Sequence, residues 1–235
     1  MMTVLGLGRR YLTAGTARYP EFVARRLRVV NGLALAASFF GIFFAIRYSL
    51  IDWRGLLPMS LCGLSGTALW LLTPVFHRSG EAWAIVYYFA VTSIVFVAFG
   101  YIAGSSAGIQ YFLLAAPAVL LAVGSVQVLT ALALTSLLVG AFAIIEFWLP
   151  PTSHIAQMSF ASATVNKALS ILGMVAISFG SIFYALRAAE TAEVELEREY
   201  GRSEHLLLNL MPTSIAARLK DRPSDIIADQ FDAVT

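Results

Sequence analysis

The fold class of this chain is decided by residues 82–145, which read AWAIVYYFAVTSIVFVAFGYIAGSSAGIQYFLLAAPAVLLAVGSVQVLTALALTSLLVGAFAII. These 64 residues lie between Glu81 and Glu146 and contain no Asp, Glu, Lys or Arg. At a rise of 1.5 Å per residue, a helix of that length would extend about 96 Å, which is roughly three crossings of the hydrocarbon core of a bilayer. The stretch therefore predicts an integral membrane protein.

The composition of the whole chain leads to the same class. Of its 235 residues, 59% are hydrophobic and only 13% are charged, and the mean hydropathy is +0.77. These values lie far outside the range of water-soluble domains. Cys62 is the only cysteine, so the chain cannot contain an internal disulfide.

Charge-free apolar runs divide the chain into spans. Small residues at Gly104 to Gly108 and at Gly124-Ser125 interrupt the long middle stretch. Pro117 lies in the short fourth segment, where we expect a kink, with a hinge as the functional alternative. The fold class we predict is all-α, with six transmembrane helices at Val29 to Ile46, Gly55 to Phe76, 82–103, 109–123, 126–147 and Ala168 to Leu186.

The positions of Lys and Arg predict the orientation. Thirteen of the 16 lie before the first span, after the second or after the sixth, and only Arg47, Arg54 and Lys167 fall on the other side. Because cytoplasmic flanks carry the excess of basic residues, both termini are expected in the cytoplasm, which also requires an even number of crossings. We expect a multi-pass protein of the bacterial cell (inner) membrane. Its parts would be a basic segment at 1–28, the membrane domain at 29–186, a signalling helix at 187–211 and a further segment at 212–235.

After Leu186 the sequence becomes strongly acidic with interleaved arginines, and no Pro interrupts 168–200. The sixth helix should therefore continue into the cytoplasm as one rod. Along this rod, apolar residues follow one another at alternating intervals of four and three positions. This pattern, an apolar seam, is typical of a coiled coil and implies a parallel homodimer. Its apolar positions are Ile182, Leu186, Ala189, Leu196, Tyr200, Leu207 and Leu210. A competing seam scores equally well, which leaves open either a poor coiled coil or a helix pair that switches register.

The segment from Arg202 to Thr235 contains the most specific motif. It reads RSEHLLLNLMPTSIAARLK, then DRPSD, then IIADQFDAVT. This order of a leucine-rich turn, a proline, an Ile-Ala-x-x-Leu helix and an Ile-Ala-Asp-x-Phe-Asp-x-Val strand entry resembles the transducer segment of class III nucleotide cyclases. Six membrane helices ahead of it resemble the membrane anchor of mycobacterial-type adenylate cyclases. The resemblance assigns transducer positions to Asn209, Pro212 and Arg218.

The resemblance implies a membrane anchor, dimerisation and signal-receiving domain whose cyclase would convert ATP to cyclic AMP with Mg²⁺ or Mn²⁺. The family's catalytic residues follow the last strand entry, so this chain is expected to end before them. We assign it no catalytic residue, metal ligand or cofactor, and we expect no cyclase activity from it alone. The partners expected are a second copy and the lipid bilayer, with an extracellular ligand as an open question and no nucleic acid.

Two other functions remain open. A six-helix transporter is disfavoured because spans three to five carry no charged residue between 82 and 145 for an ion-coupled path. The sensor module of a histidine kinase or diguanylate cyclase shares the helix count, but its output begins with different motifs.

Three polar residues on the predicted outer side form our candidate ligand or cation site: Asp52, Glu146 and His154. Glu146 ends an apolar helix, where a carboxylate is costly unless it is paired or hydrated. Pairing of Glu146 with Arg47 or Lys167 is the structural alternative. Small residues four apart, Gly41 with Ala45 and Ala176 with Gly180, permit close helix contacts.

Overall fold

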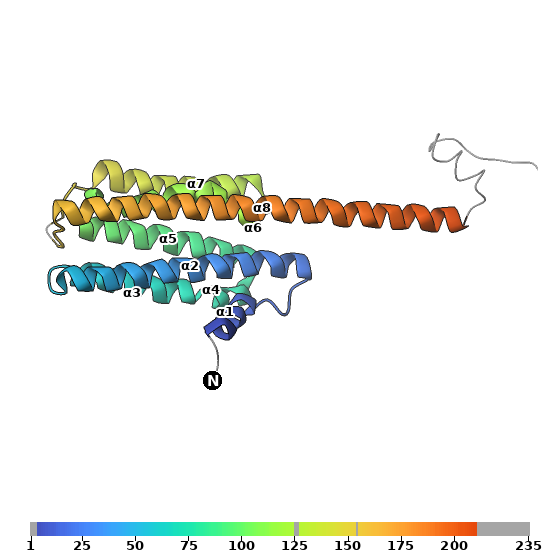
Figure 1. Ribbon diagram of the computed structural model, residues 1–235, viewed down its shortest axis with the longest axis horizontal. Coiled ribbons are helices and arrows are strands. Elements are labelled where there is room, and N and C mark those ends of the chain that lie inside the picture. Colours follow the sequence, from blue (N-terminus) through green and yellow to red (C-terminus); the bar gives the residue numbers. More distant parts are fainter. Residues whose placement is uncertain (1–3, 125–126, 154, 211–235) are drawn as a thin grey trace, which may run out of the picture. The chain divides into compact units, whose positions relative to one another are not determined.

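A computed structural model describes residues 4–124, 127–153 and 155–210, and every regular element in these ranges is helical (Figure 1). The chain divides into two units, Met1–Ala185 and Leu186–Thr235, which are described separately. The α-helices are α1 (Val4–Thr13), α2 (Glu21–Asp52), α3 (Leu57–Leu71), α4 (Thr73–Phe76), α5 (Glu81–Ala103), α6 (Ala116–Val123), α7 (Val128–Ala143) and α8 (Phe160–Leu210). The 3₁₀-helices are η1 (His77–Ser79), η2 (Ser105–Ala107) and η3 (Ile109–Ala115), and η4 (Ile144–Trp148) is a π-helix.

The prediction of an all-helical membrane fold is confirmed for the described residues. Their helices include five that are long and apolar enough to cross a membrane: Glu21–Asp52, Leu57–Ser79, Glu81–Ala103, Val128–Trp148 and Phe160–Leu206. The fourth of our six expected spans, Ile109–Val123, is a shorter apolar helix. Length and composition therefore support five membrane spans, and the segment Ile109–Val123 is shorter than a usual spanning helix.

The short fourth segment changes its winding where we expected a kink. It begins as η3 and becomes α6 at Ala116, with Pro117 in the first turn of α6. Proline fits there because its missing N–H would have no partner in a first turn. Glycines in conformations that favour glycine bound the segment as predicted, with φ +74° at Gly108 and +72° at Gly124.

Two helices extend past the charge-free runs from which we predicted them. Helix α2 begins at Glu21 and ends at Asp52, and α8 begins at Phe160, so that Lys167 lies inside the helix. Charged residues mark the edge of the apolar layer and not the end of the helix, because long basic side chains extend toward the membrane surface.

Helices α2 and α3 pack most extensively, and α5 joins them to α7 and η3. At the α2–α3 crossing, a Cβ built on Gly41 would lie 3.0 Å from the Gly63 carbonyl oxygen, and one built on Gly63 would lie 3.0 Å from that of Gly41. The close approach predicted for Gly41 and Ala45 is therefore confirmed. Gly180 differs, since no atom lies within 4 Å of a Cβ built there.

Candidate functional site

One end of the bundle holds a buried polar cluster centred on Asn166, near the start of α8. The Asn166 Oδ1 accepts hydrogen bonds from the Tyr48 hydroxyl at 2.8 Å and from Arg47 Nη1 at 3.3 Å. The Asn166 amide donates to the Ala107 carbonyl oxygen at 2.6 Å. Asn166 and Tyr48 are both fully buried. These bonds, which we call the Asn166 cluster, tie α8 to α2 and to η2.

Beside this cluster, Glu146 interacts with an amide and not with a cation. The Gln110 Nε2 donates to Glu146 Oε2 at 2.7 Å and to the Ser105 carbonyl oxygen at 2.8 Å. The ion pairs of the described residues do not include Glu146, so the expected pairing with Arg47 or Lys167 is not the one formed. The Lys167 ammonium lies 5.3 Å from the centre of the Tyr111 ring instead.

The two other members of the predicted outer site are placed differently. Asp52 is exposed and closes the turn after α2, where its Oδ1 accepts the backbone N–H groups of Arg54 at 3.1 Å and Gly55 at 3.0 Å. His154 lies outside the described residues. No hydrogen bond or ion pair in the described part of the chain joins Asp52 to Glu146. The three-residue ligand site therefore stays a prediction.

The opposite end of the bundle is closed by α1. The Asn31 Nδ2, fully buried on α2, donates to the carbonyl oxygens of Tyr11, Leu12 and Ala14 at 3.1–3.3 Å. The Tyr11 hydroxyl donates to the Trp70 carbonyl oxygen at 3.1 Å, and burial raises the pKa of Tyr11 to about 12. Asn31 therefore hydrogen-bonds between α2 and α1.

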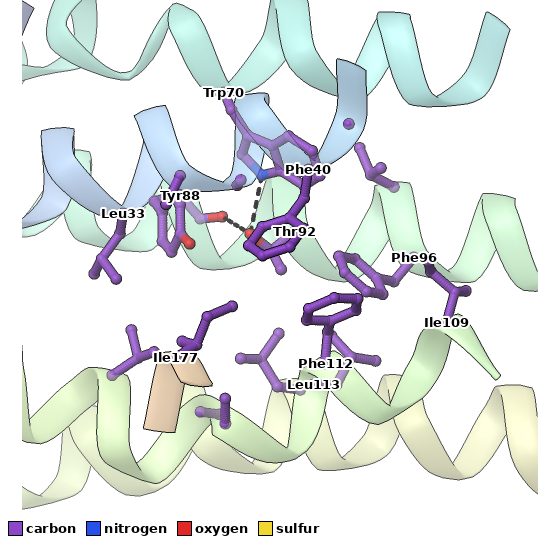
Figure 2. A pocket seen from close by; sticks show the side chains of 18 of the residues that line it. Leu33, Phe40, Trp70, Tyr88, Thr92, Phe96, Ile109, Phe112, Leu113 and Ile177 are labelled. Carbon is purple, nitrogen blue, oxygen red and sulfur yellow. Dashed lines mark hydrogen bonds between the residues drawn. The ribbon is translucent and has the colours of Figure 1, made fainter. Parts of the chain in front are cut away.

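An aromatic cavity of about 110 Å³ lies within the bundle (Figure 2). Phe112 from η3 is central to its wall, with ring centres 5.3 Å from Phe40, 6.3 Å from Phe44 and 6.2 Å from Phe96. The edge of the Phe112 ring also covers Gly173 of α8, where a Cβ would lie 2.4 Å from Phe112 Cε1. The Phe112 ring therefore contacts both the cavity and α8.

Helix α8 continues without interruption from Phe160 to Leu210, as the sequence predicts. The seam residues with described side chains are Ile182, Leu186, Ala189, Leu196 and Tyr200, and all five are exposed. The side chains of Leu207, Asn209 and Leu210 are outside the described set, as are Pro212, Arg218 and the whole segment 212–235.

Sequence reasoning missed Asn166, Tyr48 and Phe112. A buried asparagine beside Lys167 was a usable signal, because an amide inside an apolar helix needs a partner. Tyr48 and Phe112 carried no such signal, since aromatic residues are common throughout the chain and only the fold selects among them.

Buried polar contacts at both ends of an apolar bundle, together with a long last helix, are features of a helical membrane domain. A family model for MASE7 matches residues 16–200, and the chain belongs to the MASE7 family. The chain is similar to the adenylate cyclases of Mycobacterium tuberculosis strain H37Rv and Mycobacterium bovis, with 33% identity over 220 residues. That region is 93% of this chain and 49% of each relative, so the chain spans about half the length of the curated relatives it matches. The predicted resemblance to a cyclase membrane anchor is confirmed.

Proposed function

We propose that the chain is the membrane anchor and signal-receiving domain of an adenylate cyclase, and that α8 relays its state to a cytoplasmic catalytic domain. The observation that carries the proposal is α8 itself, a single helix of 51 residues in a chain of the MASE7 family. ATP and Mg²⁺ or Mn²⁺ would be bound by the catalytic domain, as the resemblance to class III cyclases implies.

The proposal includes six spans with both termini in the cytoplasm. Seven residues of 3₁₀-helix and eight of α-helix rise about 26 Å, because a 3₁₀-helix advances about 2.0 Å per residue. That is close to the roughly 30 Å of a hydrocarbon core. Most side chains of this segment are buried among α2, α5 and α7, so surrounding protein supports a segment that is short for a lipid-exposed helix.

Signal transfer would begin at the Asn166 cluster. A ligand or cation near Glu146 would act on Gln110, whose fully buried side chain has an Oε1 that accepts no hydrogen bond from the described residues. A ligand site using Glu146 with Asp52 and His154 remains part of the proposal. Its test is a thermal-shift screen of divalent cations and small organic ligands. A ligand-dependent rise in the midpoint that Glu146→Gln abolishes supports the site, and a rise unchanged by Glu146→Gln removes Glu146 from it.

The relay predicts that the helical register after Ala189 controls the output. With a class III cyclase catalytic domain fused after Thr235, inserting two alanines after Ala189 should change basal cyclic AMP production several-fold, because the following helix turns by roughly 200°. Seven inserted residues restore nearly the same face and should preserve the basal rate. Equal rates in all three fusions would contradict the relay. The unfused chain should show no conversion of ATP above a detergent blank.

The seam predicts a parallel homodimer. In a Cys62→Ala background, a cysteine at Leu196 should crosslink to its twin in high yield, because Leu196 is 70% exposed and lies on the seam. A cysteine at Arg198, two residues away and off the seam, is the matched control and should crosslink poorly. Similar yields at the two positions would remove the argument for a coiled coil.

A further inference from the structure

The aromatic cavity lies next to an open-sided cleft between α2 and α8. The cavity and the cleft, of about 110 and 480 Å³, share Leu33, Ala36 and Ile177 in their walls. Gly32 and Gly180 lie on the two sides of the cleft and leave it wide. Apolar side chains therefore form the boundary between the cleft and the cavity, so an acyl chain that displaced them would follow an apolar path from the side of the bundle to its aromatic centre.

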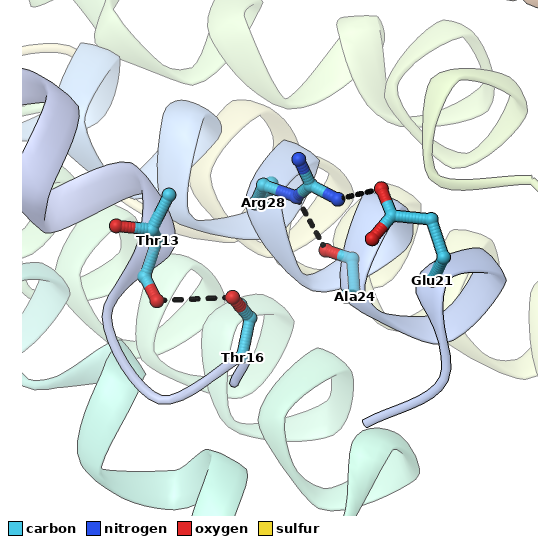
Figure 3. A network of polar contacts seen from close by, with 5 residues as sticks. All are labelled: Thr13, Thr16, Glu21, Ala24 and Arg28. Atoms are coloured by element: carbon cyan, nitrogen blue, oxygen red, sulfur yellow. Dashed lines mark hydrogen bonds and ion pairs between the residues drawn. The ribbon is translucent and has the colours of Figure 1, made fainter. Parts of the chain in front are cut away.

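The polar residues of the cleft gather toward the α1 end of the bundle. Arg25 and Arg28 of α2 and Tyr184 of α8 line it there. Arg28 is held by an ion pair with Glu21 and by a bond from its Nε to the Ala24 carbonyl oxygen (Figure 3). Arg25 is exposed and forms no ion pair within the described residues. The mouth thus offers positive charge next to apolar walls.

The aromatic cavity offers an apolar surface, because its polar groups bond to one another. The Trp70 Nε1 donates to Thr92 Oγ1 at 3.1 Å, and the Thr92 hydroxyl donates to the Tyr88 carbonyl oxygen at 2.7 Å (Figure 2). An engineered cavity of 150 Å³ holds a molecule of the size of benzene. About 110 Å³ therefore suits the end of an acyl chain and excludes a fused ring system.

We propose that the cleft and cavity bind a single-chain anionic amphiphile of the fatty-acid class. Its carboxylate would lie at Arg25 and Arg28, and the end of its chain would enter the aromatic cavity. From Arg28 to Phe44, the far wall of the cavity, α2 rises about 24 Å, a distance that suits an extended long acyl chain. The proposal rests on charge complementarity and an apolar path, and it does not depend on a cyclase being attached.

Trp70 provides the probe, because it lines the cavity and is 4% exposed, whereas Trp53, Trp83 and Trp148 are all exposed. The full chain with those three changed to Phe would be placed in nanodiscs of unlabelled phospholipid. A long-chain fatty acid with bromines near its chain end should then quench Trp70 fluorescence saturably. Unbrominated fatty acid should reverse the quenching. The methyl ester should bind about tenfold more weakly, because it lacks the charge that Arg25 attracts.

Two matched variants locate the binding path. No atom lies within 4 Å of a Cβ built on Gly180 or on Gly140, so both positions have space for a Cβ. Gly180→Phe should block the cleft and abolish quenching, whereas Gly140→Phe on α7 should leave quenching intact. Arg25→Gln, which adds no bulk, should weaken binding without lowering the saturating signal.

Four outcomes would overturn the proposal. One is the absence of saturable quenching in the folded parent chain, and another is quenching that persists unchanged in Gly180→Phe. The third is equal quenching by nanodiscs of brominated phospholipid alone, which would assign the path to bilayer lipid. The fourth is quenching that disappears when the Leu196→Cys dimer is crosslinked, which would assign the cleft to the second copy.

Discussion

Replacing Gly41 by leucine is expected to destabilise the membrane bundle by about 3 kcal/mol, the upper end of the usual cost of overpacking, because the crossing of α2 and α3 has no room for a side chain. A Cβ at Gly41 would lie 2.4 Å from Thr67 Oγ1 and 3.0 Å from the Gly63 carbonyl oxygen. The second contact is with backbone, so the helices would have to separate along their most extensive interface. Thermal unfolding in one detergent, followed by size-exclusion chromatography, measures the loss.

Gly140→Leu is the control for added bulk in a membrane helix, since a Cβ at Gly140 meets nothing within 4 Å. It should shift the thermal midpoint little. A Gly41→Leu chain as stable as Gly140→Leu would show that the α2–α3 interface is not packed as described.

Replacing Asn166 by alanine should cost about 2–3 kcal/mol of stability. Asn166 is fully buried, and its loss leaves the Ala107 carbonyl oxygen and the Tyr48 hydroxyl without these partners, at about 1–3 kcal/mol for each unsatisfied group. Hydrogen bonds between membrane helices average only about 0.6 kcal/mol each, so the three bonds of Asn166 place the lower end of this range at about 2 kcal/mol. In the cyclase fusion, the same change should alter basal cyclic AMP production, because it releases α8 from α2.

Two further variants serve as references for the stability loss of Asn166→Ala. Tyr48→Phe removes one bond of the cluster and should cost about 1 kcal/mol. Thr164→Ala lies on α8 at an exposed position, where the hydroxyl bonds only within the helix to Phe160, and should change stability by less than about 0.5 kcal/mol. If Asn166→Ala lowers the stability no more than Thr164→Ala does, the Asn166 cluster does not hold α8 in place.

The sequence was sufficient for the class of fold and for the longest helices. The charge-free stretch 82–145 and the glycines at 104, 108 and 124 placed the breaks correctly, because both signals are local. The ends of α2 and α8 were wrong by up to eight residues, because hydropathy measures the thickness of the membrane and not the length of a helix. The winding of Ile109–Val123 depends on its burial inside the bundle, which no local pattern specifies.

The candidate site was predicted less well, because it depends on which distant residues meet. Glu146 was singled out from the sequence, but its partner Gln110, 36 positions away, was not. Asn166 and Tyr48 are 118 positions apart. Their meeting is fixed by the packing of α2 against the start of α8, and a single sequence contains no direct record of such contacts.

The membrane-spanning part of α8 is less buried in the bundle than the other long apolar helices, such as α5. Only 17% of its most apolar window is buried, compared with 44% for α5, and the described contacts include the bonds at Asn166 and the Phe112 ring over Gly173. Most of the side chains in this part of α8 therefore face away from the bundle. If α8 relays a signal as proposed, we expect it to tilt or turn more readily than α5, because fewer of its side chains are held by packing. A small displacement at Asn166 would then pass along the continuous helical backbone.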